Sequence, residues 1–313
     1  MSAALVRNWL ATEKLDLPLP GHGQTAQRWQ RLADLTQADI TAGRLAEAHA
    51  DAVAILAELR GPAPSPRQWW GVWAAESGEA VLTATRTGDK VLLDGTKVWC
   101  SGAGLCTHAL VTARVSADER GLFAVDLNAH GVRPLPSRWR HAGMAESDTR
   151  SVQFTATPAV PVGSPGQYLS RPGFWHGAAG VAACWLGGAR AVAAALYDRV
   201  KSGTADAHAA AHLGAVDAAL ASAAALLKEV AGEFDADRLN RSGRAELLAR
   251  RARAAVENAV DETLDRTARA LGPSPLCLDP LHSRRVADLS IYIRQSHAER
   301  DLERLGMLAA GAS

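Results

Sequence analysis

Two short segments combine residue types that could hold a flat ligand with polar edges. Residues 94–103 read Asp-Gly-Thr-Lys-Val-Trp-Cys-Ser-Gly-Ala, and residues 147–150 read Ser-Asp-Thr-Arg. We expect a tight turn at Asp94-Gly95 and then a strand in which Trp99 offers a planar apolar wall. Ser101 follows where the strand opens into a glycine-containing loop, and it supplies a hydroxyl and a backbone N–H. A buried core tryptophan beside an ordinary hairpin is the competing interpretation.

The same segments resemble parts of the acyl-CoA dehydrogenase family. The Gly-x-Lys-x-Trp run of residues 95–99 is similar to the family's flavin-facing strand, where an indole and a hydroxyl lie against the isoalloxazine ring. Gly143-Met144, followed by residues 147–150 and Phe154, resembles the last part of the family's middle β-domain. The resemblance covers about residues 67–310 and implies FAD as the cofactor.

Composition excludes several classes of partner. The 313 residues are enough for a large core, and 34 Lys and Arg nearly balance 33 Asp and Glu. We therefore expect neither nucleic acid nor a membrane as a partner. We expect no apolar run of membrane-spanning length and no signal peptide, which predicts a soluble, cytoplasmic protein. Four scattered cysteines have neither disulfide nor zinc-ligand spacing, so no metal is expected.

Hydrophobic periodicity changes twice along the chain. Residues 28–60 have the three- and four-residue spacing of a helix, which the proline-rich stretch 61–66 ends. Short Val-, Leu-, Thr- and Trp-rich segments then alternate with turns up to about residue 161, which is typical of an antiparallel β-unit. Alanine-rich segments near 175–200, 206–233, 242–271 and 283–305 predict four long helices.

The predicted fold class is α+β and acyl-CoA dehydrogenase-like. Residues 1–66 form a short helical N-terminal region, residues 67–165 an antiparallel β-barrel-like middle domain, and residues 166–313 a C-terminal four-helix bundle. The region before Trp69 is roughly half as long as the family's N-terminal domain, which helps to wall the acyl pocket. This shortening makes an ordinary fatty-acyl substrate unexpected.

The resemblance also assigns residues to the flavin. The segment that contains Val72 and Trp73 resembles the family's strand that binds the pyrimidine end of the ring, although Trp73 stands where a threonine or serine is usual. Trp99 and Ser101 match the strand beside N5. The pyrophosphate loop is shortened to Ser77-Gly78-Glu79.

Arg199, in Arg-Val-Lys-Ser-Gly, resembles the arginine that reaches the flavin pyrophosphate of a neighbouring subunit. An arginine stabilising a helix C-terminus is an equally good interpretation. A homodimer or homotetramer is therefore expected. Leu271-Gly272 begins the family's loop over the adenosine, but Pro273 and Pro275 replace its flexible positions.

The family's catalytic base is missing from its usual place. Ser296 stands where the family has a glutamate, and a serine cannot by itself remove the α-proton of an acyl thioester. Some members place the base on the first helix of the bundle, where this chain has His176, an imidazole able to act near neutral pH. A packed or helix-capping histidine is the alternative for His176. His297 and Glu299 are further candidates.

Three functions remain open from the sequence. The first is an FAD-dependent oxidoreductase of acyl-CoA dehydrogenase type, acting on an atypical acyl thioester or another small molecule. The second is a flavin-dependent monooxygenase of the same fold, because relatives of that kind lack the glutamate. The third is a catalytically degenerate subunit that pairs with an active relative.

Overall fold

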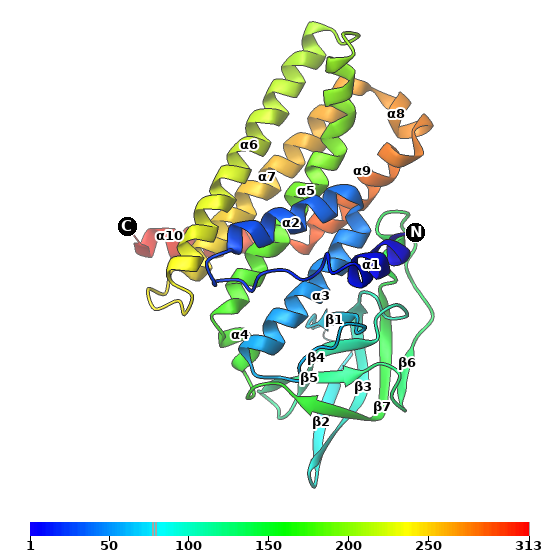
Figure 1. The fold of residues 1–313 in the computed structure, drawn as a ribbon, viewed down its shortest axis with the longest axis vertical. Coiled ribbons are helices and arrows are strands. Elements are labelled where there is room, and N and C mark those ends of the chain that lie inside the picture. The colour runs from blue at the N-terminus through cyan, green and yellow to red at the C-terminus, as the bar shows by residue number, and fades with distance from the viewer. Residues whose placement is uncertain (77, 79, 313) are drawn as a thin grey trace. The chain divides into compact units, whose positions relative to one another are not determined.

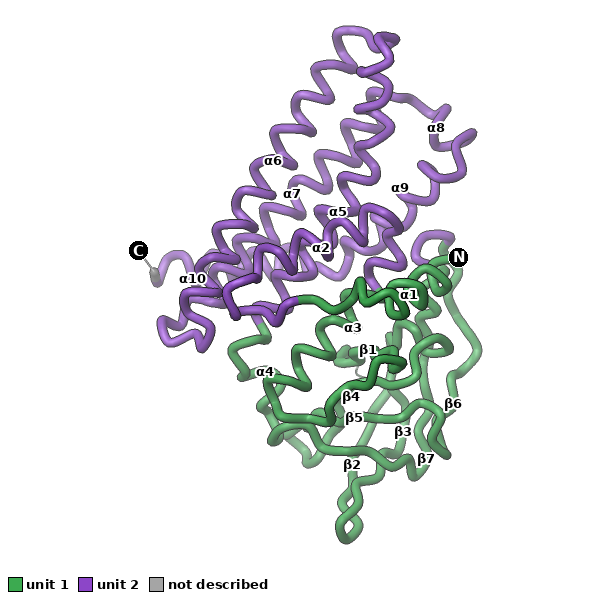
Figure 2. The backbone as a smooth tube through the Cα atoms, in the orientation of Figure 1, with its two compact units in different colours: residues 1–17, 45–141, 145–174 green, residues 18–44, 142–144, 175–313 purple. Residues whose placement is uncertain are grey.

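The computed structural model describes residues 1–76, 78 and 80–312, which group into two compact units (Figure 2). Unit 1 contains residues 1–17, 45–141 and 145–174; unit 2 contains residues 18–44, 142–144 and 175–313. The sequence predicted three consecutive regions. The two compact units do not correspond to them one to one, because each unit is assembled from separated segments. Of the shortened pyrophosphate loop, Ser77 and Glu79 lie outside the described residues.

Unit 1 holds the β-domain, together with short helices and most of a longer one (Figure 1). Its helices are α1 (Ser2–Ala11), α4 (Gln167–Ser170), the 3-10 helix η1 (Ala145–Ser147) and the larger part of α3 (Ile40–Glu58). Its strands are β1 (Trp70–Trp73), β2 (Leu82–Thr87), β3 (Lys90–Cys100), β4 (His108–Arg114), β5 (Arg120–Asp126), β6 (Val132–Pro134) and β7 (Arg150–Pro161).

The strands close on themselves. β3 pairs with β2 and β7, and β5 pairs with β7 and β4, all antiparallel. A parallel bridge between Thr83 of β2 and Arg114 of β4 completes the ring. β6 is added antiparallel to β7, and β1 is added parallel to β4, so the β-domain is barrel-like as expected but not wholly antiparallel.

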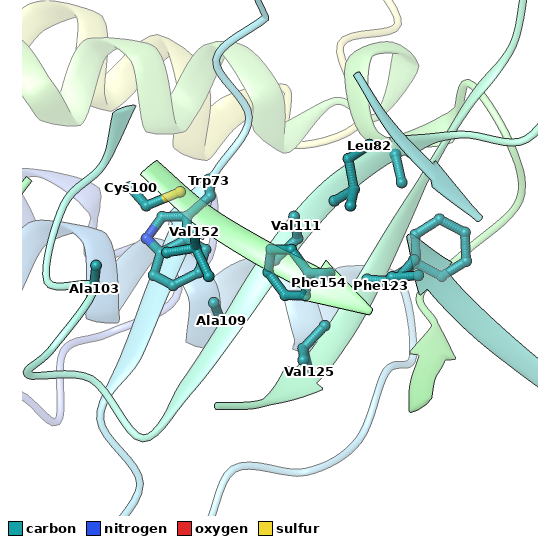
Figure 3. Packing of buried hydrophobic residues seen from close by; sticks show 12 residues of the cluster. Trp73, Leu82, Cys100, Ala103, Ala109, Val111, Phe123, Val125, Val152 and Phe154 are labelled. Atoms are coloured by element: carbon teal, nitrogen blue, oxygen red, sulfur yellow. The ribbon is translucent and has the colours of Figure 1, made fainter. Parts of the chain in front are cut away.

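Two apolar clusters stabilise the β-domain. The first fills the space inside the strands and includes Trp73, Leu93, Val111 and Phe154 (Figure 3). The second packs Trp70 and Leu110 against residues 52–56 of α3 and against Leu59, which follows the helix. Because successive side chains of a strand point to opposite faces, Trp70 and Trp73 belong to different clusters.

Asp94-Gly95 does not form the expected turn, because it lies inside β3. The hairpin between β2 and β3 turns at Gly88-Asp89 instead. The pairing register with β7 shifts between Leu93 and Gly95, and a Cβ at Gly95 would lie 2.2 Å from the carbonyl oxygen of Val81. Gly95 is thus needed for a bulge in which two backbone segments approach closely. Such bulges favour glycine, as tight turns do.

Unit 2 is helical. Its helices are α2 (Thr25–Ala38), the start of α3, most of α5 (Gly173–Lys201), α6 (Ala207–Ala236), α7 (Ala245–Leu271), α8 (Pro273–Leu278), α9 (Pro280–Tyr292), the 3-10 helix η2 (Ile293–Gln295) and α10 (Glu299–Ala312). Alanine lines much of the buried face of α5, and at Gly187 an added Cβ would lie 2.1 Å from the carbonyl oxygen of Ala33. Small residues therefore let α5 and α2 approach closely.

Two helices expected to be continuous are interrupted. The helix expected over residues 28–60 breaks at Asp39, which is extended and accepts a hydrogen bond from the Ala42 N–H as an N-terminal cap. The helix expected over residues 283–305 ends in η2. Ser296 is extended there, and its hydroxyl accepts from the Ala298 N–H, a local bond that competes with the helical ladder.

Two helices, α5 and α6, are long and apolar enough by length and composition to span a membrane. This corrects the expectation that no such run occurs. The apolar window of α5 is 78% buried within the protein, as in a core helix, whereas that of α6 is 22% buried. Length and composition alone are weak evidence for a membrane, because core helices pass the same test.

Candidate functional site

Trp99 stands out because an unusual backbone presents its indole to solvent. Its φ is 59°, and its side chain is 62% exposed. The pairing of β3 with β7 shifts register between Lys97 and Cys100, so Trp99 lies in a bulge. Bulges redirect side chains, and a left-handed tryptophan is unfavourable unless its surroundings hold it there. The strand thus presents the planar apolar surface of the Trp99 indole to solvent, where a ligand could reach it.

The residues behind Trp99 hold this conformation. The Trp73 indole lies in the core beside Cys100 and Val152 (Figure 3), and its Nε1–H donates to the Ser101 carbonyl oxygen at 2.9 Å. Trp73 is 1% exposed, so its side chain supports the site from inside. The indole itself is enclosed by the barrel, and the role of Trp73 toward a cofactor stays a prediction.

The second predicted segment lies against the first. The Gly102 N–H donates to the Ser147 carbonyl at 2.7 Å, and the Ala103 N–H donates to the Asp148 carbonyl at 3.2 Å. Asp148 has a φ of 47°, and its carboxylate accepts from the Gly104 N–H and the Arg150 guanidinium. The two segments are therefore joined by backbone bonds and by the bond from Gly104 to the Asp148 carboxylate, while the Arg150–Asp148 ion pair lies within the second segment.

A row of hydroxyl groups results from this contact. The Ser101 and Thr149 hydroxyl oxygens are 3.0 Å apart, and the Thr149 and Ser147 hydroxyl oxygens are 2.8 Å apart. Ser147 is buried, whereas Thr149 and Ser101 are half-buried. The row therefore runs from the interior of the β-domain toward its surface and ends at Ser101, two residues from Trp99.

Lys97 connects the same strand to the barrel wall. Its ammonium is buried and donates to Glu76 Oε1 at 2.8 Å, to Thr112 Oγ1 at 2.7 Å and to the Thr112 carbonyl at 3.0 Å. Burial lowers the pKa of Lys97 despite the nearby carboxylate. Burial acts to raise the pKa of Glu76, but the bonds from Lys97 and Thr112 outweigh it and the net pKa is lowered. Lys97 therefore has a structural role, because it ties the strand that carries Trp99 to Glu76 and Thr112.

Val72 lies on the other face of β1. It is half-buried and packs on the cluster that contains Trp70 and Leu110, whereas Trp73 faces the barrel interior. The Trp70 N–H donates to His49 Nδ1 at 3.2 Å, so His49 joins α3 to β1. The structure therefore brings Trp73, Trp99 and Ser101 together and leaves the Val72 side chain in a different environment.

His176, the predicted base, lies near the start of α5 in unit 2. It is 2% exposed, and its ring lies 4.3 Å from that of Phe234 in α6. Gly21 is close enough that a Cβ there would lie 3.0 Å from the imidazole. The geometry favours the packed histidine that the sequence left as an alternative, because the ring is buried against Phe234 within the helical unit.

Arg199 lies in the last turn of α5 and is exposed. Twenty-three residues of one helix separate it from His176, or about 35 Å along the axis at 1.5 Å per residue. The two residues thus cannot act on the same small ligand within one chain. The role of Arg199 toward a neighbouring chain stays a prediction.

Ser296, at the position of the missing glutamate, donates its hydroxyl hydrogen to Glu257 Oε2 of α7 at 2.6 Å. The sequence gave no sign that Glu257 comes this close, because the two residues belong to different helices. Of the other candidates, His297 has its Nδ1 3.7 Å from Oδ1 of Asp301 in the first turn of α10, and Glu299 is exposed. Among the described residues, no group of three or more His, Cys, Asp or Glu could hold a metal ion.

Among the surface hollows of the described residues, two in unit 2 are each bounded by α2, α5 and α6. Their volumes are about 430 and 390 Å³, and Arg190 and Ala224 line both. No predicted site residue lines either of them. Of the predicted residues in the β-domain, Trp99 is exposed, Ser101 is half-buried and Trp73 is enclosed by the barrel.

The comparisons with known proteins agree with this fold. Residues 75–157 match the family model for the acyl-CoA dehydrogenase middle domain, a range that includes Trp99, Ser101 and most of the strands. A search of curated protein sequences gives no significant match. The resemblance found in the sequence is confirmed: the middle domain is of the acyl-CoA dehydrogenase type, and the chain has the acyl-CoA dehydrogenase-like fold.

Solved structures resemble the whole chain. The dibenzothiophene monooxygenase TdsC from Paenibacillus sp. A11-2 is 20% identical with a TM-score of 0.80, over 92% of this chain and 84% of that chain. A nitrososynthase from Micromonospora carbonacea var. africana is 19% identical with a TM-score of 0.76, over 96% and 88%. KijD3, in complex with FMN and a dTDP-linked amino sugar, is 17% identical with a TM-score of 0.76, over 92% and 80%.

Proposed function

We propose that this protein is a flavin-dependent oxidoreductase of the monooxygenase type. The observation that carries the proposal is the exposed Trp99 in a left-handed conformation, beside the hydroxyl of Ser101, in a domain of the acyl-CoA dehydrogenase middle type. Solved structures of similar fold support it, since TdsC is a monooxygenase and is described in complex with FMN and indole.

The residues present suit a flavin. An isoalloxazine ring combines an apolar face with polar atoms along its edges. Trp99 would supply apolar contact to the face, and the Ser101 hydroxyl would supply a hydrogen-bond partner for an edge. The positive φ of Trp99 and the bonds that hold Ser101 give both groups a fixed position before any ligand arrives, which lowers the ordering cost of binding.

Oxygenation is favoured over dehydrogenation of an acyl thioester. Dehydrogenation needs a base near the α-carbon. At the expected position this chain has Ser296, which is occupied in a hydrogen bond with Glu257, and His176 is enclosed by packing. An oxygenation does not need that base. When bound in its reduced form, a flavin supplies two electrons to dioxygen, so that one oxygen atom enters the substrate and the other leaves as water.

FMN is better supported than FAD. The family's loop over the adenosine would begin at Leu271-Gly272, but here Gly272 ends α7 and Pro273 starts the helix α8. Proline suits the first turn of a helix because its missing N–H has no helical partner there. A helix in place of the flexible loop gives no support for adenosine binding, and FMN has no adenosine. FAD, expected from the sequence, therefore remains the alternative.

The roles of the chain's own residues follow from their positions. Trp99 and Ser101 would bind and orient the flavin, and Thr149, Ser147 and Trp73 would hold Ser101 in place. We propose that the substrate is a small molecule. TdsC and KijD3 are described with indole and with a nucleotide-linked sugar, which offers two chemically distinct classes to try.

Flavin binding provides the direct test. We would titrate FMN and FAD into the purified protein, following flavin fluorescence and absorbance. We expect FMN to bind and Trp99→Ala to weaken it at least tenfold, because the indole that faces the ring is removed. Leu169→Ala is the matched control, since Leu169 lies in unit 1 and is 61% exposed. Failure of the protein to bind either flavin would favour the degenerate-subunit alternative.

Oxygen transfer is tested next. The protein would be supplied with chemically reduced FMN and air, with indole, dibenzothiophene or an acyl-CoA as the trial substrate. Oxygenated product from labelled dioxygen would support the monooxygenase. Anaerobic bleaching of the bound oxidised flavin by an acyl-CoA would show that the protein is a dehydrogenase.

A further inference from the structure

The hydroxyl row Ser147–Thr149–Ser101 can be assigned a direction from hydrogen counting. Each hydroxyl has one hydrogen to donate and can also accept. The distances of 2.8 and 3.0 Å show that both neighbouring pairs are hydrogen-bonded, although either oxygen of each pair could be the donor. The row has three arrangements. All hydrogens can point outward to Ser101, all can point inward to Ser147, or both serines can donate to Thr149, which would leave the Thr149 hydrogen without an acceptor among the described residues.

The buried end of the row, at Ser147, distinguishes the outward arrangement from the inward one. Ser147 is 2% exposed, and across residues 1–76, 78 and 80–312 its hydroxyl has no hydrogen-bond partner other than Thr149. In the inward arrangement the Ser147 hydrogen would be buried without an acceptor, which costs about 1–3 kcal/mol. In the outward arrangement Ser147 donates to Thr149 and Thr149 donates to Ser101, so the hydroxyl hydrogens of Ser147 and Thr149 both have an acceptor.

The outer end then has a defined chemistry. In the outward arrangement Ser101 accepts from Thr149 and keeps its own hydrogen for a partner at the surface. We infer that Thr149 and Ser147 are positioning residues that make Ser101 a hydrogen-bond donor, so that the site prefers a ligand atom that accepts. This inference rests on the proposed function, and it adds two residues that the sequence assigned no role.

The preference has a consequence for a flavin. Reduction changes N5 of the ring from a hydrogen-bond acceptor to a donor N–H. A Ser101 fixed as a donor therefore favours the oxidised form. A Ser101 released from Thr149 could also turn to accept, which would raise the affinity for the reduced form relative to the oxidised form.

Thr149→Val and Thr149→Ser make the matched pair of variants. Valine keeps the branched shape but removes the hydroxyl, and serine keeps the hydroxyl but removes the methyl group. The affinities of oxidised FMN and of dithionite-reduced FMN would be measured under nitrogen for the natural protein and both variants. The midpoint potential of bound FMN gives an independent readout without any turnover.

In Thr149→Val we expect the ratio of reduced to oxidised affinity to rise about tenfold, which corresponds to an increase of about 30 mV in the two-electron potential. Thr149→Ser should retain the natural ratio. In a Ser101→Ala background, Thr149→Val should cause no further change, because the group through which it acts is gone.

Three outcomes would overturn the inference. An unchanged ratio in Thr149→Val would show that Thr149 does not direct Ser101. An equal shift in Thr149→Val and Thr149→Ser would assign the effect to packing of the methyl group. A natural protein that binds neither FMN nor FAD would reject the proposed function and this inference together, whereas the first two outcomes reject the inference alone.

Discussion

The β-domain and the helical unit hold their buried polar groups in different ways. Around Trp99 the backbone is left-handed, Lys97 is hydrogen-bonded to Thr112, and Ser101 is hydrogen-bonded to Thr149. In the helical unit, His176 lies against the ring of Phe234, and the Arg253 guanidinium lies 4.5 Å from the Trp185 ring centre, both on regular helices. Strained backbone braced by polar bonds indicates a site, whereas a polar ring in a regular helix is explained by packing.

The comparison is first tested where we expect the largest effect, at Trp73. Trp73→Ala should lower the free energy of unfolding by about 3–5 kcal/mol, because a large buried side chain is removed from the barrel core. Trp73→Phe keeps much of the volume but loses the bond to Ser101, and should cost less. Chemical denaturation measures both. A small effect of the alanine variant would mean that the core tolerates its loss and that Trp73 does not brace the site.

His176→Ala should lower the free energy of unfolding by about 2–3 kcal/mol, because a buried ring that packs on Phe234 is lost. Flavin affinity should stay unchanged. His208→Ala is the control, since His208 is an exposed histidine of α6 and should have little effect. If His176→Gln folds normally but loses turnover together with its pH dependence, His176 is the base after all.

Arg199 separates a helix-capping role from a phosphate contact. We expect Arg199→Ala to weaken flavin binding about tenfold and to leave stability nearly unchanged, because a guanidinium pairs bidentately with phosphate oxygens. Lys201→Ala is the control for general charge in the same helical turn. The oligomeric state would be measured in parallel by light scattering. A monomer that binds flavin normally would remove the neighbouring-chain role of Arg199.

Electrostatics at α10 should give a smaller, pH-dependent effect. Hydrogen bonds from Arg304, and also from Arg250, lower the pKa of Glu246. A carboxyl with a lowered folded-state pKa adds stability above its unfolded pKa, near 4.5, and loses it as pH falls through the folded value.

Glu246→Gln should therefore cost about 0.5–1 kcal/mol at pH 7 and nearly nothing in acid. Denaturation at several pH values measures this difference. Asp265→Asn, in the exposed pair with Arg269, should cost less. A cost of Glu246→Gln that does not vary with pH would show that the ion pairs do not hold α10.

The smallest stability effect is expected at Trp99 itself. Trp99→Gly removes an exposed indole and places at φ 59° the one residue that accepts this conformation readily. The free energy of unfolding should change by less than about 1 kcal/mol in either direction. Flavin binding should nevertheless fall strongly. A large loss of stability would show that the indole packs on the protein and is not a ligand surface.

The sequence by itself determined the type of the β-domain and the segments that matter. Residues 94–103 and 147–150 were recognisable because a strand with a tryptophan and a nearby small hydroxyl residue is a local pattern. The missing glutamate at Ser296 and the prolines after Gly272 were equally readable. These features depend on residue identity and spacing along the chain, which need no knowledge of distant contacts.

Only the tertiary structure decided which side chains meet. The sequence assigned both Trp73 and Trp99 to the flavin, but a bulge turns Trp99 outward while the barrel encloses the Trp73 side chain. Thr149 lay within a recognised segment, yet its role became visible only when its hydroxyl was found beside that of Ser101. Glu257 gave no signal at all, because its bond to Ser296 joins residues 39 positions apart. Such pairings depend on strand register and helix packing, which no local pattern contains.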